Sequence, residues 1–333
     1  MHIFNPRLTH ALCASIVFAF AAGFAMPSTA RASDVWPTKP IRIVVPVAAG
    51  SATDLVAREL ARRLTKGLGQ TAFIDNRAGA DMAIGIVTAA KSPADGYTWL
   101  LVSSTLTASP ALKKVAFDPV KDFSPVSIVG YATTVAVVPP ELGVHSLKEF
   151  VDRARSRPGE INYANPSIGA LGHLHTALLE NATGIKLTSI PYKGSAPAMT
   201  DLLANRVNFM MAPPGVALPY VQDGKLQALW VVGAERSPLY PSVPTLRELG
   251  IKDVDLEAWM GILLPVGTPL AVVTRVQAAI DAALREPGAR EALERAGIRV
   301  APGGTPAEFA QQIRADLVQW PRIFEIANVK RED

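Results

Sequence analysis

The stretch 48–54, Ala-Ala-Gly-Ser-Ala-Thr-Asp, has the composition of an anion-binding turn. It follows the apolar run IRIVVPV and precedes a segment whose apolar residues have helical spacing. Small side chains at a helix N-terminus leave backbone N–H groups open to an anion. A phosphate, the oxyanion of a reaction and the carboxylate of a ligand would each fit such a turn.

Sequence motifs argue against a nucleotide and against catalysis. The turn lacks both the G-x-x-x-x-G-K-[ST] pattern of a P-loop and the G-x-G-x-x-G pattern of a dinucleotide site, and it contains no Lys or Arg. The chain has no G-x-S-x-G nucleophile turn. We therefore expect no catalytic residues and no cofactor, although a triad can also be assembled from scattered residues.

Histidines give no metal-binding pattern. Beyond the N-terminal segment they are His145, His173 and His175. Two residues apart on a helix, His173 and His175 point to different sides, so they do not form a pair of ligands. We expect His173 to hydrogen-bond its own loop and His175 to lie on the outer face of its helix.

Three further loops resemble the first in composition: 76–85, 103–110 and 165–175. Each follows a β-like run and is rich in small or hydroxyl-bearing residues. One such loop is typical of any β-to-α connection, but four of them in a chain without catalytic motifs favour a binding protein. The candidate contacts in these loops are Gly79, Asp81, Ser104, Ser167, Gly169, Ala170, Leu171, Gly172 and His173.

Apolar β-like runs alternate with helical segments along most of the chain, and the part after residue 268 is mainly helical. This alternation predicts an α/β fold of parallel sheets covered by helices. Roughly 300 residues suggest two lobes or one large domain. Crossings are expected near 130–140 and 244–259, which assigns 33–136 and 252–333 to a discontinuous lobe 1 and 137–251 to lobe 2.

The first 32 residues have the pattern of a secretory signal peptide: a short basic head, an apolar run over 11–25 and a small-x-small site at 30–32. Cleavage after Ala32 would remove Cys13, the one cysteine. It would also remove Arg7 and Arg31. The 33 basic residues would become 31, against 29 acidic residues, so the net charge would be about +2. This balance, without basic clusters, argues against nucleic acid. We expect a periplasmic protein without disulfides.

Several segments, in order, carry a resemblance to a known family. They include "WPTKPIRIVVP" from residue 36, "NRAGA" from 76, "PADGY" from 93 and "PYKGSAPAMTDL" from 191. Later come "RSPLYPSVPT" from 236 and "WMGILLPVGTP" from 259. The chain resembles the Bug-type periplasmic solute-binding proteins of tripartite tricarboxylate transporters, the TctC-like family, along nearly all of its predicted mature length.

The resemblance implies a two-lobe periplasmic binding protein of the Venus-flytrap, type II-like kind. Each lobe would be a mainly parallel sheet flanked by helices, with a small carboxylate held between the lobes. The first loop would offer backbone N–H groups to one end of the ligand, and the residues that match the family pattern there are Ala49, Gly50, Ser51, Thr53 and Asp54. The loop that contains Gly169 and His173, here called the clamp loop, would bind the ligand's carboxylate. Asp201 matches the family's Asp near the site, where it either touches the ligand or stabilises its own helix.

Departures from the family pattern concern specificity. The second glycine of the first loop is Ser51, and a glycine pair elsewhere is replaced by Asp81 and Met82. The clamp loop carries Pro166, Ala170, Leu171 and Gly172 where hydroxyls are common, with Ser167 at a usual glycine. Because unpaired polar ligand groups cost about 1–3 kcal/mol each, we expect a monocarboxylate, an amino acid or an aromatic acid rather than citrate. Asp81 would pair with a ligand ammonium group, disfavour additional ligand carboxylates, or be an ordinary solvated loop residue.

The sequence therefore predicts a non-enzymatic, monomeric binding protein. It would deliver a small organic carboxylate to the membrane permease subunits of a tripartite transporter. A ligand sensor that signals to a membrane receptor is the alternative on the same fold. An exported hydrolase is a further alternative, and it would require a nucleophile and base in the cleft.

Overall fold

The computed structural model describes residues 36–251, 254, 256–301 and 303–331. The predicted signal peptide and its cleavage site therefore lie outside the described residues. A large six-stranded sheet has the order β11-β4-β10-β3-β1-β2. Its strands are β1 (Ile41–Val45), β2 (Ala72–Asn76), β3 (Thr98–Ser103), β4 (Phe123–Ala132), β10 (Ala258–Pro265) and β11 (Ile298–Val300).

Strand directions in this sheet correct one expectation. Strand β1 pairs in parallel with β2 and β3, but β10 is antiparallel to both β3 and β4, and β11 is antiparallel to β4. The sheet is thus mixed and not mainly parallel. Strand β10 enters from a distant part of the chain and inserts between β3 and β4, and a buried strand has the same apolar pattern in either direction.

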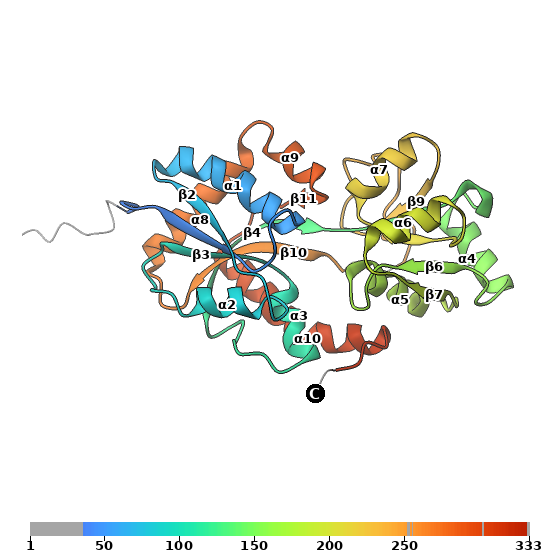
Figure 1. Cartoon of the computed structure of the whole chain (residues 1–333), viewed down its shortest axis with the longest axis horizontal. Helices are drawn as coiled ribbons and strands as arrows, with labels where there is room; N and C mark the ends of the chain where they lie inside the picture. The colour runs from blue at the N-terminus through green and yellow to red at the C-terminus, as the bar shows by residue number, and fades with distance from the viewer. Residues whose placement is uncertain (1–35, 252–253, 255, 302, 332–333) are drawn as a thin grey trace, which may run out of the picture. The chain divides into compact units, whose positions relative to one another are not determined.

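Helices cover both faces of the large sheet. Figure 1 shows α1 and α9 on one side, and α2, α3 and α10 on the other. Helix α1 buries the stripe Val56, Ala57, Leu60 and Leu64 and ends at Gly69, whose φ of 67° suits glycine. The helices are α1 (Ala52–Leu68), α2 (Ala83–Ala90), α3 (Thr105–Leu112), α8 (Leu270–Arg285), α9 (Ala289–Arg295) and α10 (Pro306–Ile326).

The middle of the chain builds a second, smaller set of sheets. Strand β5 (Val135–Val138) lies between β8 (Met210–Ala212) and β9 (Gln227–Val231), antiparallel to both. Strands β6 (Asn162–Asn165) and β7 (Thr188–Pro191) form a parallel pair. This part is therefore not mainly parallel either. Around it are the 3₁₀ turn η2 (Pro140–Leu142), α4 (Leu147–Ser156), α5 (Leu171–Thr183), α6 (Ser195–Leu203) and α7 (Pro214–Gln222).

Two apolar clusters flank the small sheet. Val135 and Val137 of β5 belong to one cluster, and Ala136 and Val138 belong to the other, as the alternation of a strand requires. The second cluster also contains Trp320 and Phe324 from the C-terminal half of α10. Residues Phe309 and Ile313 of the same helix pack under the large sheet. Helix α10 therefore contributes to the cores of both sheets.

The chain passes between the sheets at two extended segments. The first is Thr133 and Thr134, between β4 and β5, and the second includes Leu256 and Glu257, just before β10. The predicted lobe boundaries themselves stay a prediction. Among the described residues, no helix combines the length and apolar character needed to cross a membrane.

Candidate functional site

Eight of the predicted contacts gather at one edge of the large sheet, among them Ala49, Thr53 and Asp54 in or next to the first loop. Strands β1, β2 and β3 are parallel neighbours, so their carboxyl ends lie at the same edge. The loops that leave this edge carry the predicted residues Gly50, Ser51, Gly79, Asp81 and Ser104. Ligands of open α/β sheets bind outside the carboxyl ends of their strands.

The first loop is held together by Asp54. The side chain of Asp54 is 1% exposed and accepts hydrogen bonds from Gly50 N at 2.9 Å, Asn76 Nδ2 at 2.9 Å and Arg58 Nε at 2.8 Å. Burial alone would raise its pKa, but the hydrogen bonds from Arg58, Gly50 and Asn76 outweigh burial and lower the pKa of Asp54 below its usual value. Both carboxylate oxygens are occupied. Asp54 therefore has a structural role in the loop, and the backbone around Gly50 is the part of the loop that is exposed.

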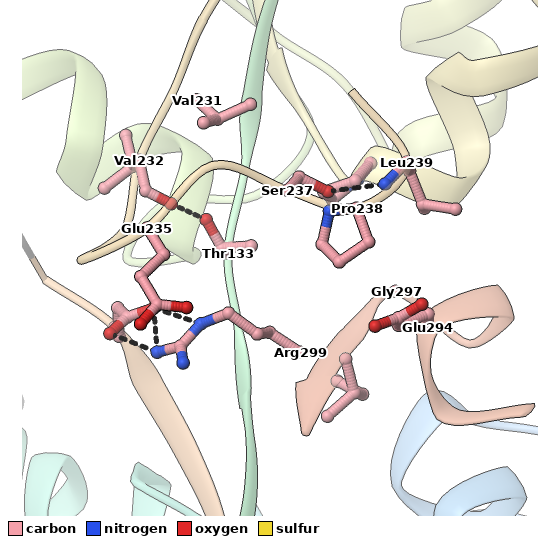
Figure 2. A pocket seen from close by; sticks show the side chains of 13 residues that line it. Thr133, Val231, Val232, Glu235, Ser237, Pro238, Leu239, Glu294, Gly297 and Arg299 are labelled. Atoms are coloured by element: carbon pink, nitrogen blue, oxygen red, sulfur yellow. Dashed lines mark hydrogen bonds and ion pairs between the residues drawn. The ribbon is translucent and has the colours of Figure 1, made fainter. Parts of the chain in front are cut away.

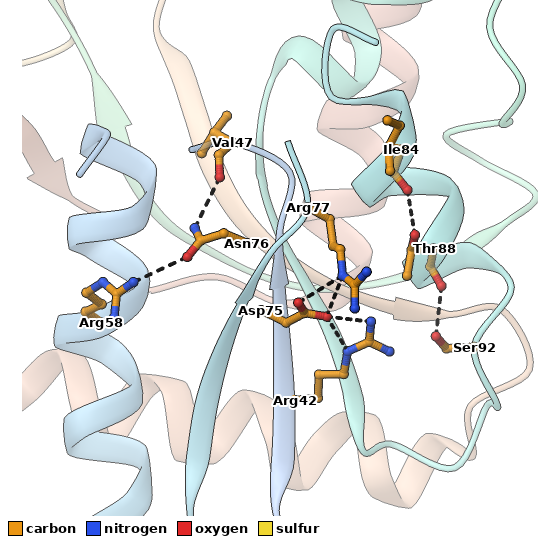
Figure 3. A network of polar contacts seen from close by, with 9 residues as sticks. All are labelled: Arg42, Val47, Arg58, Asp75, Asn76, Arg77, Ile84, Thr88 and Ser92. Atoms are coloured by element: carbon orange, nitrogen blue, oxygen red, sulfur yellow. Dashed lines mark hydrogen bonds and ion pairs between the residues drawn. The ribbon is translucent and has the colours of Figure 1, made fainter. Parts of the chain in front are cut away.

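Neighbouring residues complete this support. The Ser51 hydroxyl caps α1 by accepting from Asp54 N at 3.3 Å. Asn76 also donates to the carbonyl of Val47 at 3.1 Å and accepts from Arg58 at 3.3 Å, as Figure 3 shows. Ala49 and Gly50 are exposed, whereas Thr53 is buried. Asn76 and Arg58 were not predicted as part of the site. Asn76 ends β2, beside the first loop, and Arg58 lies one helical turn after Asp54, so both positions indicate a contact with Asp54.

The second loop has an unusual backbone. Ala80, Asp81 and Met82 have φ values of 45°, 48° and 74°, three successive non-glycine residues in the left-handed region. Asp81 is exposed and forms an ion pair with Lys113, which follows α3. The carboxylate is therefore already paired, which the sequence alone could not indicate because the two residues are distant in the chain. Ser104 is buried at the start of α3, and its N–H donates to the Trp259 carbonyl at 2.9 Å.

A second group of predicted contacts lies at the carboxyl end of β6. The clamp loop 166–170 turns through Gly169, at φ 76°, and the N–H of Ala170 donates to the Ser167 carbonyl at 3.1 Å. Helix α5 then begins at Leu171, and its N-cap residue, Ala170, makes no side-chain capping bond. Because the first N–H groups of a helix have no intrahelical acceptor, the N-terminus of α5 offers open donors.

Gly172 and His173 have structural roles in this group. A Cβ atom on Gly172 would lie 2.4 Å from the Met211 carbonyl oxygen, so glycine lets α5 approach β8. His173 accepts at Nδ1 from Gly169 N at 3.1 Å, as expected. Desolvation lowers the pKa of His173. The ring is therefore neutral at pH 7 and supplies no formal charge to a ligand.

Asp201 is linked to the clamp loop through β7 and the residues after it. The N–H of Tyr192 donates to the Asn165 carbonyl at 2.8 Å, and the Tyr192 hydroxyl donates to Asp201 at 2.9 Å. Arg206 also donates to Asp201, at 2.9 Å. The hydrogen bonds from Tyr192 and Arg206 hold the pKa of Asp201 below its usual value. This arrangement favours the structural one of the two roles considered for Asp201.

Three large apolar side chains in or directly after these loops are exposed. Leu55 in the first turn of α1 and Ile84 in the first turn of α2 are each 50% exposed, and Ile168 in the clamp loop is 70% exposed. Exposed apolar groups beside open N–H donors suit a ligand with both a charged and an apolar part.

One expectation about histidines is wrong. His175 has no exposed surface and lies inside the structure. Helix α5 packs against both β8 and α10, so most of its circumference is covered and no outer face is available at this position. The described residues contain no group of three His, Cys, Asp or Glu side chains arranged to hold a metal ion.

Comparison with known proteins decides the family. A family model described as "Tripartite tricarboxylate transporter family receptor" matches residues 56–329. The chain belongs to this receptor family. It is 37% identical over 327 residues to protein BugT of Bordetella pertussis, covering 97% of this chain and 99% of that protein.

Solved structures of this receptor family share the fold. A Rhodopseudomonas palustris protein, Rpa4515 with adipate, is 32% identical with a TM-score of 0.73, covering 90% of this chain and all (100%) of that one. MatC of Rhodopseudomonas palustris, with bound malate, is 30% identical with a TM-score of 0.67, covering 86% and 99%. The predicted α/β periplasmic binding protein fold and the predicted membership of a solute-binding receptor family are confirmed.

Proposed function

We propose that this receptor binds a small organic carboxylate between the loops of its two sheets, in the periplasm, and presents it to the permease subunits of a tripartite transporter. The observation that carries the proposal is the N-terminus of α5, which has open N–H donors and no capping side chain. A helix N-terminus favours an anion through these donors and through the helix dipole. Relatives that share the fold hold malate and adipate.

The first loop would supply the second contact. Asp54 fixes the backbone at Gly50, which is exposed. A ligand anchored at α5 by its carboxylate would reach the first loop with its other end. Ligand binding would thereby favour the closed arrangement of the two parts, which a permease can distinguish from the open one.

The ligand we propose is a monocarboxylate, an amino acid or an aromatic acid. Leu55, Ile84 and Ile168 offer apolar surface, and the ion pair between Lys113 and Asp81 leaves neither charge isolated. Adipate and malate each carry two carboxylates, so a dicarboxylate is the competing class. We further propose that the chain is not an enzyme, acts as a monomer and is processed after Ala32.

Calorimetric titration of the mature protein, residues 33–333, tests the ligand class. The panel is benzoate, nicotinate, several amino acids, malate, adipate and citrate. We expect a monocarboxylate, an amino acid or an aromatic acid to bind with a Kd at least tenfold below the Kd of malate, adipate or citrate. Preferential binding of malate or adipate would keep the carboxylate site but overturn the ligand class. Failure of every carboxylate to bind would overturn the proposed function.

A further inference from the structure

One imidazole bonds to both segments that run between the sheets. His175, in the second turn of α5, has its Nδ1 atom 2.7 Å from Thr134 Oγ1 and its Nε2 atom 2.6 Å from the Leu256 carbonyl oxygen. Thr134 connects β4 to β5, and Leu256 precedes β10 on the return path. Thr134 is 2% exposed and His175 is fully buried, so water does not compete for these bonds.

The partners fix the protonation of the ring. A carbonyl oxygen only accepts, so Nε2 carries the proton and donates to Leu256. In the neutral ring Nδ1 is then an acceptor, and the Thr134 hydroxyl donates to it. Both ring nitrogens are used, and replacing the ring would leave a buried hydroxyl and a buried carbonyl unpaired.

Other contacts fix the ends of the same segments. Val232 N donates to the Thr134 carbonyl at 2.9 Å, and the Thr133 hydroxyl bonds to the Val232 carbonyl. Both carboxylate oxygens of Glu257 accept hydrogen bonds from Nη2 of Arg299 in β11, each at 2.8 Å. Figure 2 shows Thr133, Val232 and Arg299 around a pocket beside the first segment. The first segment is thus held at Thr133 and Thr134 and the second at Glu257, and His175 joins the two to each other.

We propose that His175 is a positioning residue that holds the two crossing segments together, so that they act as a single hinge between the two sheet-bearing parts. We call this pair of hydrogen bonds, to Thr134 and Leu256, the clasp. The residue lies one helical turn after Leu171, where the proposed carboxylate site begins. A ligand held at the start of α5 would therefore act on the hinge through a single rigid turn. This last step rests on the proposed function, whereas the clasp itself does not.

Distance measurement between two spin labels tests the clasp without any ligand. The mature chain has no cysteine of its own, because Cys13 lies in the predicted leader. Labels are placed by Lys66→Cys on α1 and Lys148→Cys on α4, both exposed positions. We expect His175→Phe, which fills the space but makes neither bond, to widen the distance distribution at least twofold. Thr134→Val, which removes one bond, should widen it less.

The matched control is Thr183→Val at the end of α5. Its buried hydroxyl donates to the Leu179 carbonyl at 2.7 Å within the helix, so it tests the loss of a buried bond without the crossing segments. We expect the wild-type distribution for this variant. If His175→Phe and Thr134→Val both kept the wild-type distribution, or Thr183→Val widened it equally, the clasp would be refuted. Should His175→Phe fail to fold, Thr134→Val against Thr183→Val decides.

Titration of benzoate or malate into the same labelled proteins separates the two proposals. A widened distribution in the variants together with no carboxylate binding in the wild type would support the clasp and overturn the proposed function. Carboxylate binding together with unchanged distributions would do the reverse.

Discussion

The carboxylate of Asp54 accepts a 2.9 Å hydrogen bond from the backbone N–H of Gly50. This bond turns a side chain of the predicted ligand site inward, where it also binds Asn76 and Arg58. The loop is thereby shaped before any ligand arrives, which reduces the entropy lost on binding.

Asp54→Asn should lower the free energy of unfolding at pH 7 by about 1–3 kcal/mol, since it leaves buried donors without a charged acceptor. The native pKa of Asp54 is lowered, so its contribution is present above the unfolded value of 3.8 and is lost as the pH falls through the native value. Urea unfolding at pH 7 and at pH 2.5 should show the difference from wild type shrinking at the lower pH. Asp152→Asn, in an exposed ion pair with Lys148, serves as control and should change little.

Ala170→Asp should abolish ligand binding while stabilising the protein. Ala170 has the extended backbone of an N-cap, φ −68° and ψ 156°, so an aspartate there can bond to the open N–H groups of α5. Capping contributes about 0.5–2 kcal/mol, and the new charge would repel a carboxylate. Calorimetric titration and thermal unfolding together check this, with Ala170→Asn as the uncharged cap. Unaltered affinity in Ala170→Asp would exclude α5 as the anchor.

Gly172→Ala should destabilise the protein by about 1–3 kcal/mol or more, the range for overpacking. The added methyl would lie 2.4 Å from a backbone oxygen that cannot move without disturbing β8. Gly67→Ala is the matched control, because a Cβ added to that helical glycine would meet no atom within 4 Å. It should be stabilising by about 0.5–1 kcal/mol, the usual gain for a helix interior. Denaturant unfolding of both variants measures the contrast.

Acid should weaken the fold through His175. Burial lowers its pKa from 6.5 to about 4, so the unfolded state takes up a proton in this window while the native state does not. The free energy of unfolding therefore falls as the pH falls from 6.5 to 4, by about 3 kcal/mol for this residue. Comparing wild type with His175→Gln at pH 7.5 and pH 4.5 isolates the effect from His173, whose pKa is lowered too. Thr183→Val should lose stability equally at both pH values; a pH-independent difference for His175→Gln would contradict the assignment.

Ile168→Ser should weaken the binding of an apolar carboxylate by roughly fivefold, the value of about 1 kcal/mol of lost apolar contact. The stability of this variant should be unchanged, because the Ile168 side chain is 70% exposed. Val318→Ser on α10, 80% exposed, is the control for removing surface apolar area. Equal affinities for the two variants would show that Ile168 does not reach the ligand.

Local patterns in the sequence predicted local structure well. The segment after the first turn, predicted to be helical from the spacing of its apolar residues, is α1 (Ala52–Leu68), because its apolar stripe and its capping residue both lie within one short segment. The candidate loops were located because a strand, a small-residue turn and a helix follow one another directly. The family resemblance added the architecture.

Local sequence patterns could not predict the contacts between distant segments. Nothing near β10 indicates that it inserts antiparallel between β3 and β4. Likewise, the burial of His175 depends on Thr134 and Leu256, and the pairing of Asp81 depends on Lys113. Each is decided by tertiary packing, which places residues together that the sequence keeps apart.

The path of α10 has a consequence for folding. This last helix gives Phe309 and Ile313 to the core of the large sheet and Trp320 and Phe324 to the core of the small one. Neither core is complete without α10. Both sheet-bearing parts therefore depend on α10 and should fold as one cooperative unit. Truncation before residue 306 should abolish both cores at once, leaving no independently stable half.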